Sequence, residues 1–194
     1  AEGIDYVERM QKATTRMQTL ITDLLSLSRA TSKSQPFSPV DLGNIVTDVL
    51  AELEARIEQV GGKVEVGDLP TVDAEPLQMR QLFQNLIGNA LKYSEKVDCP
   101  RVSVGVIAET DPEVFYVRDN GAGFDMECAN KLFGMFQRLH SAKDFPGNGV
   151  GLAAVQHIVR RHGGRIWAEA AVGQGACFFF TLDASYHHQR RTER

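Results

Sequence analysis

The stretch "DNGAGF", residues 119–124, directly follows "EVFYVR", residues 113–118, a run that is rich in strand-forming residues. An Asp and an Asn at the end of a strand, followed by two glycines, can form a simple turn, because Asp and Asn tolerate left-handed backbone and glycine completes the bend. The same arrangement can present a carboxylate to a ligand. The six residues alone leave both interpretations open, so the flanking sequence must decide between them.

Composition and charge exclude several classes of protein. The chain has 194 residues, of which 43% are hydrophobic and 24% charged, as expected of one globular domain with an appendage. A net charge of −4 gives no broad electrostatic reason to bind nucleic acid or an anionic membrane. No apolar stretch approaches the roughly 20 residues that a membrane span needs, and the first residues do not resemble a signal peptide.

The cysteines indicate the redox setting. Cys99, Cys128 and Cys177 are odd in number, widely spaced and without a CxxC pair. This pattern argues against a disulfide framework and against a zinc site, so we expect a reducing, cytoplasmic environment.

The N-terminal segment predicts a long helix. Between residues 4 and 30, apolar residues recur at spacings of three and four, at Met10, Ala13, Met17, Leu20, Leu24 and Leu27. Ile21 and Leu25 widen this heptad stripe, which is typical of a helix in a four-helix bundle. A surface helix on its own domain is the alternative. The segment "TSKSQPFSP", with its serines and prolines, favours a separate element, so we assign residues 1–32 to a bundle helix and 33–40 to a linker.

The remaining residues predict a mixture of helices and strands. A helix is expected between an N-cap at Asp41 and a stop at Gly61, and a second one from near Asp73, with Pro76 in its first turn. Strands are expected at 63–69, 101–108, 113–119 and in a hairpin over 163–183, with a helix at 150–162 before it. Because helices cluster early and strands pair late, we predict a two-layer α/β sandwich with a mixed sheet, and a disordered tail at 185–194.

Polar residues lie on one face of the second helix. Asn85, Asn89 and Lys92 are spaced by four and three residues, and Tyr93 adjoins them. Amide oxygens are hard ligands that suit Mg²⁺, and a lysine suits a phosphate. A solvated polar face explains the same pattern, so the helix alone does not decide.

A second glycine cluster precedes the last helix. In "FPGNGVGLAAV", residues 145–155, Gly147, Gly149 and Gly151 stand where a helix begins, and backbone N–H groups at such a point can bind an anion. A flexible loop is the alternative, and the absence of a βαβ unit argues against a dinucleotide fingerprint. The preceding stretch, residues 131–148, carries Phe133 and Phe136 at the base of a long loop, which favours a lid.

The order of these motifs resembles one family. From about Phe37 to Leu182 the chain looks like the catalytic, ATP-binding domain of a sensor histidine kinase, which has the GHKL-type (Bergerat) fold. "NLIGNALKY" resembles the family's N box, "DNGAGF" its first glycine box, "LFGMFQRL" its F box and "GNGVGLA" its second glycine box. The N-terminal helix is similar to the second helix of the family's dimerisation and phosphoacceptor hairpin.

The resemblance implies roles for individual residues. Asp119 would accept a hydrogen bond from the exocyclic amine of adenine, and Gly121 and Gly123 would let the backbone approach the nucleotide. Asn89, with Asn85, would contact Mg²⁺, and Arg138 would reach the γ-phosphate of ATP from the lid. The further nucleotide contacts implied by the motifs are Lys92, Tyr93, Phe124, Gly147, Gly149, Val150, Gly151 and Leu152.

One departure from the family shapes the expected function. The family's phosphoacceptor histidine lies in a His-Glu/Asp-x-x-x-Pro motif, and none of the five histidines stands in one. Residues 41–184 are therefore expected to act as the ATP-binding kinase domain that donates a phosphoryl group to a histidine elsewhere. The implied partners are the receiver domain of a response regulator and a second copy of the parent, which forms a homodimer through the bundle helix.

Two other functions remain open. GHKL-type ATPases place a glutamate general base on the Asn helix one turn before the Mg²⁺ ligand, and here that position is Asn85, an amide that cannot take a proton. This favours the kinase over an ATPase. A non-catalytic nucleotide-binding module is the second alternative, and the intact motifs argue only that binding is retained. The sequence has Asn148 where the family often has Thr or Ser.

Overall fold

A computed structural model describes residues 14, 36–107, 110–141, 144–145 and 147–183. The predictions of a bundle helix over residues 1–32, apart from Thr14, and of a disordered tail over 185–194 fall outside these ranges. The same holds for the first part of the predicted linker.

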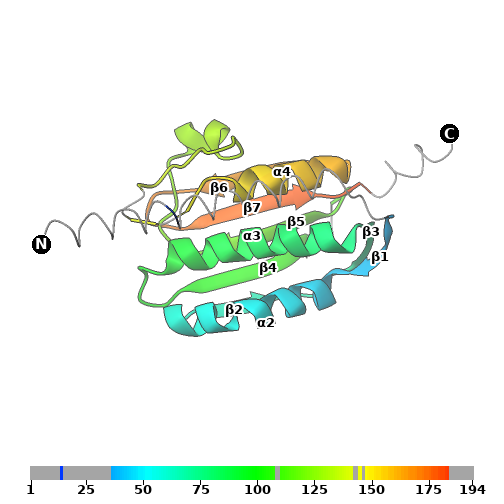
Figure 1. Cartoon of the computed structure of the whole chain (residues 1–194), viewed down its shortest axis with the longest axis horizontal. Coiled ribbons are helices and arrows are strands. Elements are labelled where there is room, and N and C mark those ends of the chain that lie inside the picture. The colour runs from blue at the N-terminus through cyan, green and yellow to red at the C-terminus, as the bar shows by residue number, and fades with distance from the viewer. Residues whose placement is uncertain (1–13, 15–35, 108–109, 142–143, 146, 184–194) are drawn as a thin grey trace, which may run out of the picture.

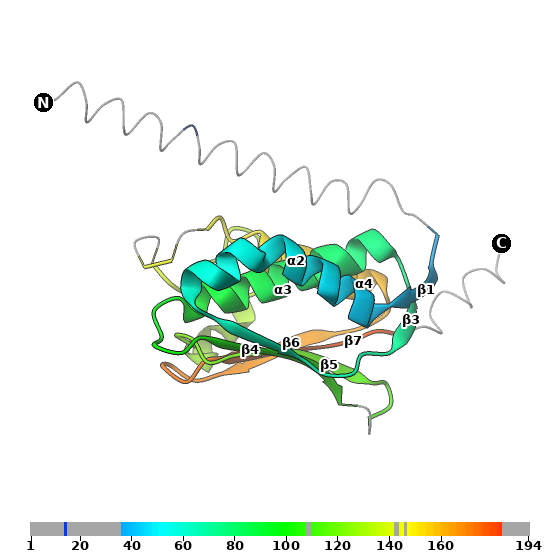
Figure 2. The same cartoon turned by 90° about the horizontal axis from the view of Figure 1, so that it is seen from below.

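A five-stranded mixed sheet forms one layer of the domain (Figures 1 and 2). Its strands, in spatial order, are β2 (Lys63–Val66), β4 (Arg101–Ile107), β5 (Val114–Asp119), β7 (Ala176–Thr181) and β6 (Ile166–Ala170). The β2–β4 pair is parallel and the other pairs are antiparallel. The predicted mixed sheet is therefore confirmed, with the strand that carries "DNGAGF" at its centre.

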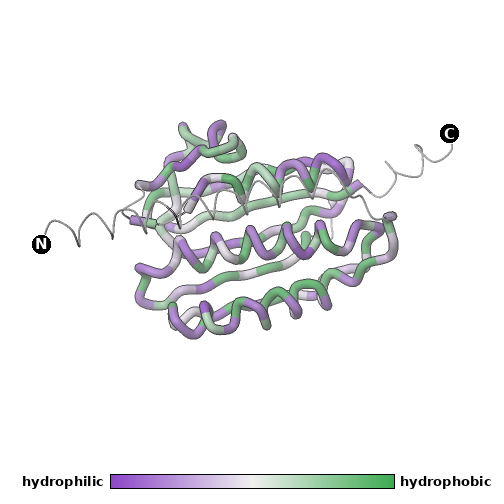
Figure 3. The backbone as a smooth tube through the Cα atoms, viewed as in Figure 1, coloured by the Kyte–Doolittle hydropathy of each residue, from purple (hydrophilic) through white to green (hydrophobic). Residues whose placement is uncertain are grey.

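Three helices cover one face of this sheet and form the second layer (Figure 2). They are α2 (Leu42–Val60), α3 (Pro76–Ser94) and α4 (Gly151–Arg161), and a 3₁₀ helix, η1 (Met126–Lys131), lies in the connection before α4. Apolar and polar positions alternate along each helix, as expected where only one face is buried (Figure 3). The predicted two-layer sandwich is confirmed.

The ends of α2 agree with the sequence predictions, whereas the start of α3 does not. The Asp41 side chain accepts a hydrogen bond of 3.0 Å from the backbone N–H of Asn44, and Gly61 ends α2 with φ of 62°. Both predicted caps are confirmed. The predicted start of α3 near Asp73 is wrong, because Thr71–Ala74 form strand β3, which pairs with β1 (Ser38–Asp41) in a separate two-stranded sheet. The end of the predicted linker is thus part of a strand.

The hydrophobic core lies between the helices and the sheet. Phe180 of β7 is fully buried, stacks on Phe115 of β5 with ring centroids 5.2 Å apart, and meets the edge of Phe83 of α3 at 6.0 Å. Leu82, Leu86 and the other buried apolar residues of α3 fill the space beside them. Helix α3 is therefore held against the middle of the sheet.

The opposite face of the sheet carries a row of aromatic residues. Gly105, Tyr116, Phe179 and Trp167 are direct neighbours across β4, β5, β7 and β6. They face away from the helices, because side chains alternate along a strand and Phe115 points into the core. Trp167 stacks on Phe179 with centroids 5.5 Å apart, and Tyr116 lies over Gly105, where an added Cβ would come within 2.6 Å of the Tyr116 hydroxyl.

The cysteines and the hydropathy of the helices add two facts. Cys99 is exposed, Cys128 is half-buried and Cys177 is buried, and all three are free thiols. Within the part of the chain that the structure describes, no helix combines the length and the apolar character that crossing a bilayer requires.

Two leucines of α3 test the role of its buried face. Leu82 is fully buried and Leu77 is 58% exposed, although both lie on the same helix. We expect Leu82→Ala to lower the free energy of unfolding by about 2–5 kcal/mol, because it leaves a cavity in the core. Leu77→Ala is the matched control and should change it by less than about 0.5 kcal/mol. Urea denaturation followed by circular dichroism measures both, and similar losses would show that α3 does not pack as described.

Candidate functional site

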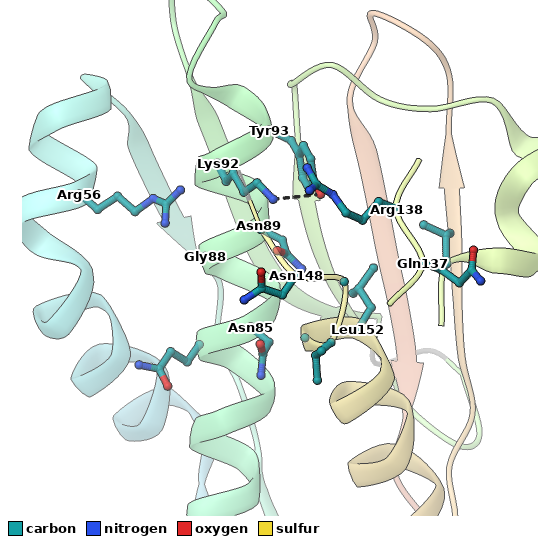
Figure 4. Close-up of a pocket in the computed structure, with 16 residues that line it drawn as sticks. Arg56, Asn85, Gly88, Asn89, Lys92, Tyr93, Gln137, Arg138, Asn148 and Leu152 are labelled. Carbon is teal, nitrogen blue, oxygen red and sulfur yellow. Dashed lines mark hydrogen bonds between the residues drawn. The ribbon is translucent and has the colours of Figure 1, made fainter. Parts of the chain in front are cut away.

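A cavity of about 310 Å³ lies between α3, the start of α4 and the loop that precedes α4 (Figure 4). It is lined by most of the site residues predicted from the sequence: Asn85, Asn89, Lys92, Tyr93, Arg138, Gly147, Gly149, Val150, Gly151 and Leu152. The structure therefore brings together residues from three motifs, of which the first and the last are more than fifty positions apart. The lining residues that sequence reasoning missed are Arg56, Gln84, Gly88, Leu132, Gln137 and Asn148.

A smaller cavity of about 50 Å³ adjoins the first one. Asp119, Gly123 and Phe124, all predicted from the sequence, line it. It shares five lining residues with the larger cavity, namely Tyr93, Leu132, Gln137, Arg138 and Leu152. The two cavities therefore form one continuous site with Asp119 at one end.

Asp119 is a buried carboxyl group, only 6% exposed. Its Oδ1 accepts hydrogen bonds from the backbone N–H of Gly121, at 2.8 Å, and of Ala176, at 3.3 Å. Burial raises the pKa of Asp119 to about 6, although these two hydrogen bonds oppose the rise. Among the described residues, both hydrogen bonds to this carboxyl group are accepted by Oδ1. Oδ2 can therefore accept a hydrogen bond from a donor group on a ligand.

The glycines after Asp119 have a packing role. A Cβ added to Gly121 would lie 2.4 Å from the carbonyl oxygen of Tyr93, and one added to Gly123 would lie 1.9 Å from that of Ala171. Gly123 also has φ of 58°, which disfavours other residues. Gly121 lines neither cavity. The close approach that the structure shows is thus to protein backbone, and approach to a nucleotide stays a prediction.

Positive charge gathers at the other end of the site. Lys92, Arg138 and Arg56 line the larger cavity, and none of the described residues that line it is an Asp or a Glu. The pKa of Lys92 is lowered to about 8, first by burial, then by Arg138 and Arg56, while Glu95 opposes the shift. The Lys92 ammonium also donates a hydrogen bond of 3.2 Å to the Tyr93 hydroxyl. Such an arrangement fits a ligand with several negative charges.

The two asparagines stand where α3 meets the start of α4. The side-chain amide N–H of Asn85 donates to the carbonyl of Gln81 at 2.8 Å, and a Cβ added to Gly151 would lie 2.7 Å from Asn85 Oδ1. Gly151 therefore allows the two helices to approach closely. No cluster of three His, Cys, Asp or Glu residues suited to a metal occurs in the described ranges, so a cation here would depend on amide oxygens and on the ligand's own oxygens.

The loop before α4 is held by internal hydrogen bonds and packs against the end of α3. The backbone N–H of Phe136 donates to the carbonyl of Gly149 at 2.9 Å, and Arg138 donates to the backbone carbonyl of Phe145. His140 packs against Tyr93 and Phe145, and each pair of the three rings has centroids 5.1–5.2 Å apart. Two members of this aromatic cluster, Tyr93 and His140, line the Asp119 cavity. Movement of the loop as a lid stays a prediction.

Several known proteins are similar to this chain in sequence and in fold. A family described as "Histidine kinase-, DNA gyrase B-, and HSP90-like ATPase" matches residues 74–186. Cyanobacterial phytochrome A of Nostoc sp. is 35% identical over 191 residues, which cover 98% of this chain and 25% of the phytochrome. The methanogenesis regulatory histidine kinase FilI of Methanothrix harundinacea is 37% identical over 174 residues, which cover 89% of this chain and 19% of FilI.

A solved structure adds a comparison of the fold. The crystal structure of full-length ShkA in complex with AMPPNP matches with a TM-score of 0.72 and 26% identity, and the match covers 95% of this chain and 40% of that one. The chain spans a quarter or less of the length of the two sequence relatives above.

The raised pKa of Asp119 predicts a pH-dependent stability. Its folded-state pKa of about 6 lies above the ordinary value of 3.8, so folding favours the protonated form. Protonated Asp119 therefore contributes about 3 kcal/mol to the free energy of unfolding. This contribution is complete below pH 4 and is lost as the pH rises through 6. We expect Asp119→Asn, which does not titrate, to become more stable relative to the wild type between pH 4.5 and 7.5.

Urea denaturation at pH 4.5, 6 and 7.5 measures this difference. Asp68→Asn is the matched control, because Asp68 is an exposed carboxyl in the loop after β2. Parallel pH curves for Asp119→Asn and the wild type would contradict the expectation.

Proposed function

Because this chain belongs to the histidine kinase-, DNA gyrase B- and HSP90-like ATPase family, as the ATP-binding catalytic domain of a histidine kinase, we propose that it binds Mg·ATP across the two joined cavities. The γ-phosphoryl group then passes to a histidine outside the printed sequence, for relay to the receiver domain of a response regulator. One observation carries this proposal: a buried carboxylate lies at one end of the site, and toward the other lie cations with no carboxylate among the described lining residues.

The carboxylate end selects the base. Adenine carries an exocyclic amine that can donate a hydrogen bond to Asp119, whereas guanine carries a carbonyl at that position. Two acceptors facing each other in a buried site leave both without a partner, so guanine is rejected. Phe124 and Leu152 provide the apolar walls of the same pocket.

The cationic end holds the triphosphate. Lys92 and Arg138 balance its charge, and the backbone of Gly147, Gly149 and Gly151, at the start of α4, presents N–H groups to its oxygens. Asn89 and Asn85 fit Mg²⁺ as hard oxygen ligands that complement the phosphates, which is how proteins usually bind this ion. When bound, the ion neutralises charge on the β- and γ-phosphates.

The residue at position 85 favours phosphoryl transfer over hydrolysis. An ATPase of this family needs a base to activate water, and the Asn85 amide, whose N–H is already used by Gln81, cannot accept a proton. A water molecule in the site is therefore a poor nucleophile. The imidazole of an acceptor histidine needs no such base, since its own nitrogen lone pair attacks the phosphorus atom.

The organisation of the parent belongs to the same proposal. Residues 41–184 form the catalytic domain together with the end of the predicted linker, which belongs to β1. Residues 1–32 pair with a second copy in a homodimer, and the rest of the 33–40 segment connects the two. The heptad stripe in the sequence supports the pairing, and the three free thiols suit a reducing, cytoplasmic location.

Substitution of Asp119 tests base recognition. Asp119→Asn keeps the shape of the side chain and replaces a charged acceptor with a neutral one, so ATP affinity should fall about 10- to 100-fold. Discrimination against GTP should fall with it. Isothermal titration with Mg·ATP and Mg·GTP measures both affinities. Equal ATP affinity in the variant and the wild type would refute the assignment of Asp119, and no ATP binding to the wild type would refute the proposed function.

Substitution of Asn89 tests the magnesium contact. Asn89→Ala removes an amide ligand, so the increase in ATP affinity that added Mg²⁺ produces should be reduced about tenfold or more, whereas binding of ATP in EDTA should change little. Titration calorimetry with and without Mg²⁺ separates the two effects. Asn44→Ala, an exposed asparagine on α2, is the control. An unchanged response to Mg²⁺ would show that Asn89 does not contact the ion.

A further inference from the structure

Arg56 lines the nucleotide cavity although it lies outside every motif in the sequence. It belongs to α2, the helix that the motifs do not involve, and its side chain is half-buried. Figure 4 shows it extending from α2 toward the part of α3 that carries Lys92 and Asn89. Helix α2 therefore contributes a cation to a site otherwise built from α3, the loop and α4.

The ordinary explanation for an arginine on a helix does not apply here. Glu52 stands four residues before Arg56, in the spacing and order that favour an ion pair along a helix. Glu52 instead pairs with Arg80 of α3, which also lies 3.5 Å from Asp48. Among the described residues Arg56 has no salt bridge, so its charge is directed at the cavity without a carboxylate partner.

The position of Arg56 along the site indicates what it contacts. Asp119 lines the smaller cavity, Tyr93 and Arg138 line both, and Arg56 lines only the larger one. A nucleotide with its base at Asp119 passes the shared residues before it reaches Arg56. Arg56 is close enough to Lys92 to lower the pKa of that lysine, as Arg138 does. The end of the ligand farthest from the base thus lies beside Lys92 and Arg56, the two cations that line only the larger cavity.

We propose that Arg56 binds the terminal phosphate of a nucleoside triphosphate and makes the site prefer ATP to ADP. A guanidinium group presents two parallel N–H donors that match two oxygens of a phosphate. A diphosphate ends before it reaches Arg56 and gains nothing from it. This inference rests on the proposed function, because it requires the nucleotide to lie with its base at Asp119.

The test compares two nucleotides on matched variants of the full chain. Affinities for Mg·ATP and Mg·ADP are measured by isothermal titration for the wild type, Arg56→Ala, Arg56→Lys and Arg160→Ala. Arg160→Ala is the control for net charge, because Arg160 is exposed in the last turn of α4, away from the cavity. Arg56→Ala should lose about 10- to 100-fold in ATP affinity and less than about twofold in ADP affinity.

Arg56→Lys should recover part of the loss, since it restores the charge but not the paired donors. Arg160→Ala should match the wild type for both nucleotides. Equal losses of ATP and ADP affinity in Arg56→Ala, or no loss of either, would overturn the proposal and leave the proposed function intact. A wild-type chain that binds neither nucleotide would overturn the proposed function first. Thermal denaturation of each variant establishes that it is folded, and Arg56→Gln replaces Arg56→Ala if the alanine variant is not.

Discussion

The buried carboxyl group of Asp119 is the constraint on which the rest of the structure depends. It stands at the end of the central strand β5, and the N–H groups of Gly121 and Ala176 hold its Oδ1 in place. The chain then turns so closely under the end of α3 that only glycine fits against the Tyr93 carbonyl. The turn that Asp119 stabilises therefore packs directly against the end of α3. The polar face of α3 that lines the larger cavity is positioned by this contact.

The charged groups that line the site lower the stability of the unliganded domain. A buried carboxylate at neutral pH is unfavourable in the unliganded domain, and so is the close approach of Lys92, Arg138 and Arg56. A ligand that donates a hydrogen bond at one end and carries negative charge at the other relieves both. Binding of such a ligand to the folded state alone raises the free energy of unfolding by mass action. The domain is thus more stable with its nucleotide than without it.

Local chemistry explains which features the sequence could predict. The caps of α2 at Asp41 and Gly61 and the ordered motifs from Asn85 to Gly151 rely on neighbouring residues, so they were found. Strands β1 and β3 were missed because each has only four residues and their pairing joins segments about thirty positions apart. Arg56 was missed because it lies on α2, outside every motif, and only the packing of α2 beside α3 brings it to the cavity.

The aromatic row on the open face of the sheet has a spectroscopic consequence. Trp167 is the single tryptophan of the chain, and its ring stacks on Phe179 and contacts the guanidinium of Arg165. Phe178 of β7, which lines the smaller cavity, belongs to the core between the sheet and the helices, so this cavity lies on the other side of the sheet from Trp167. Its ultraviolet emission therefore reports whether the sheet is intact and is insensitive to occupancy of the site. A single sample can reveal melting through this indole and ligand uptake through a labelled nucleotide, without interference between the two signals.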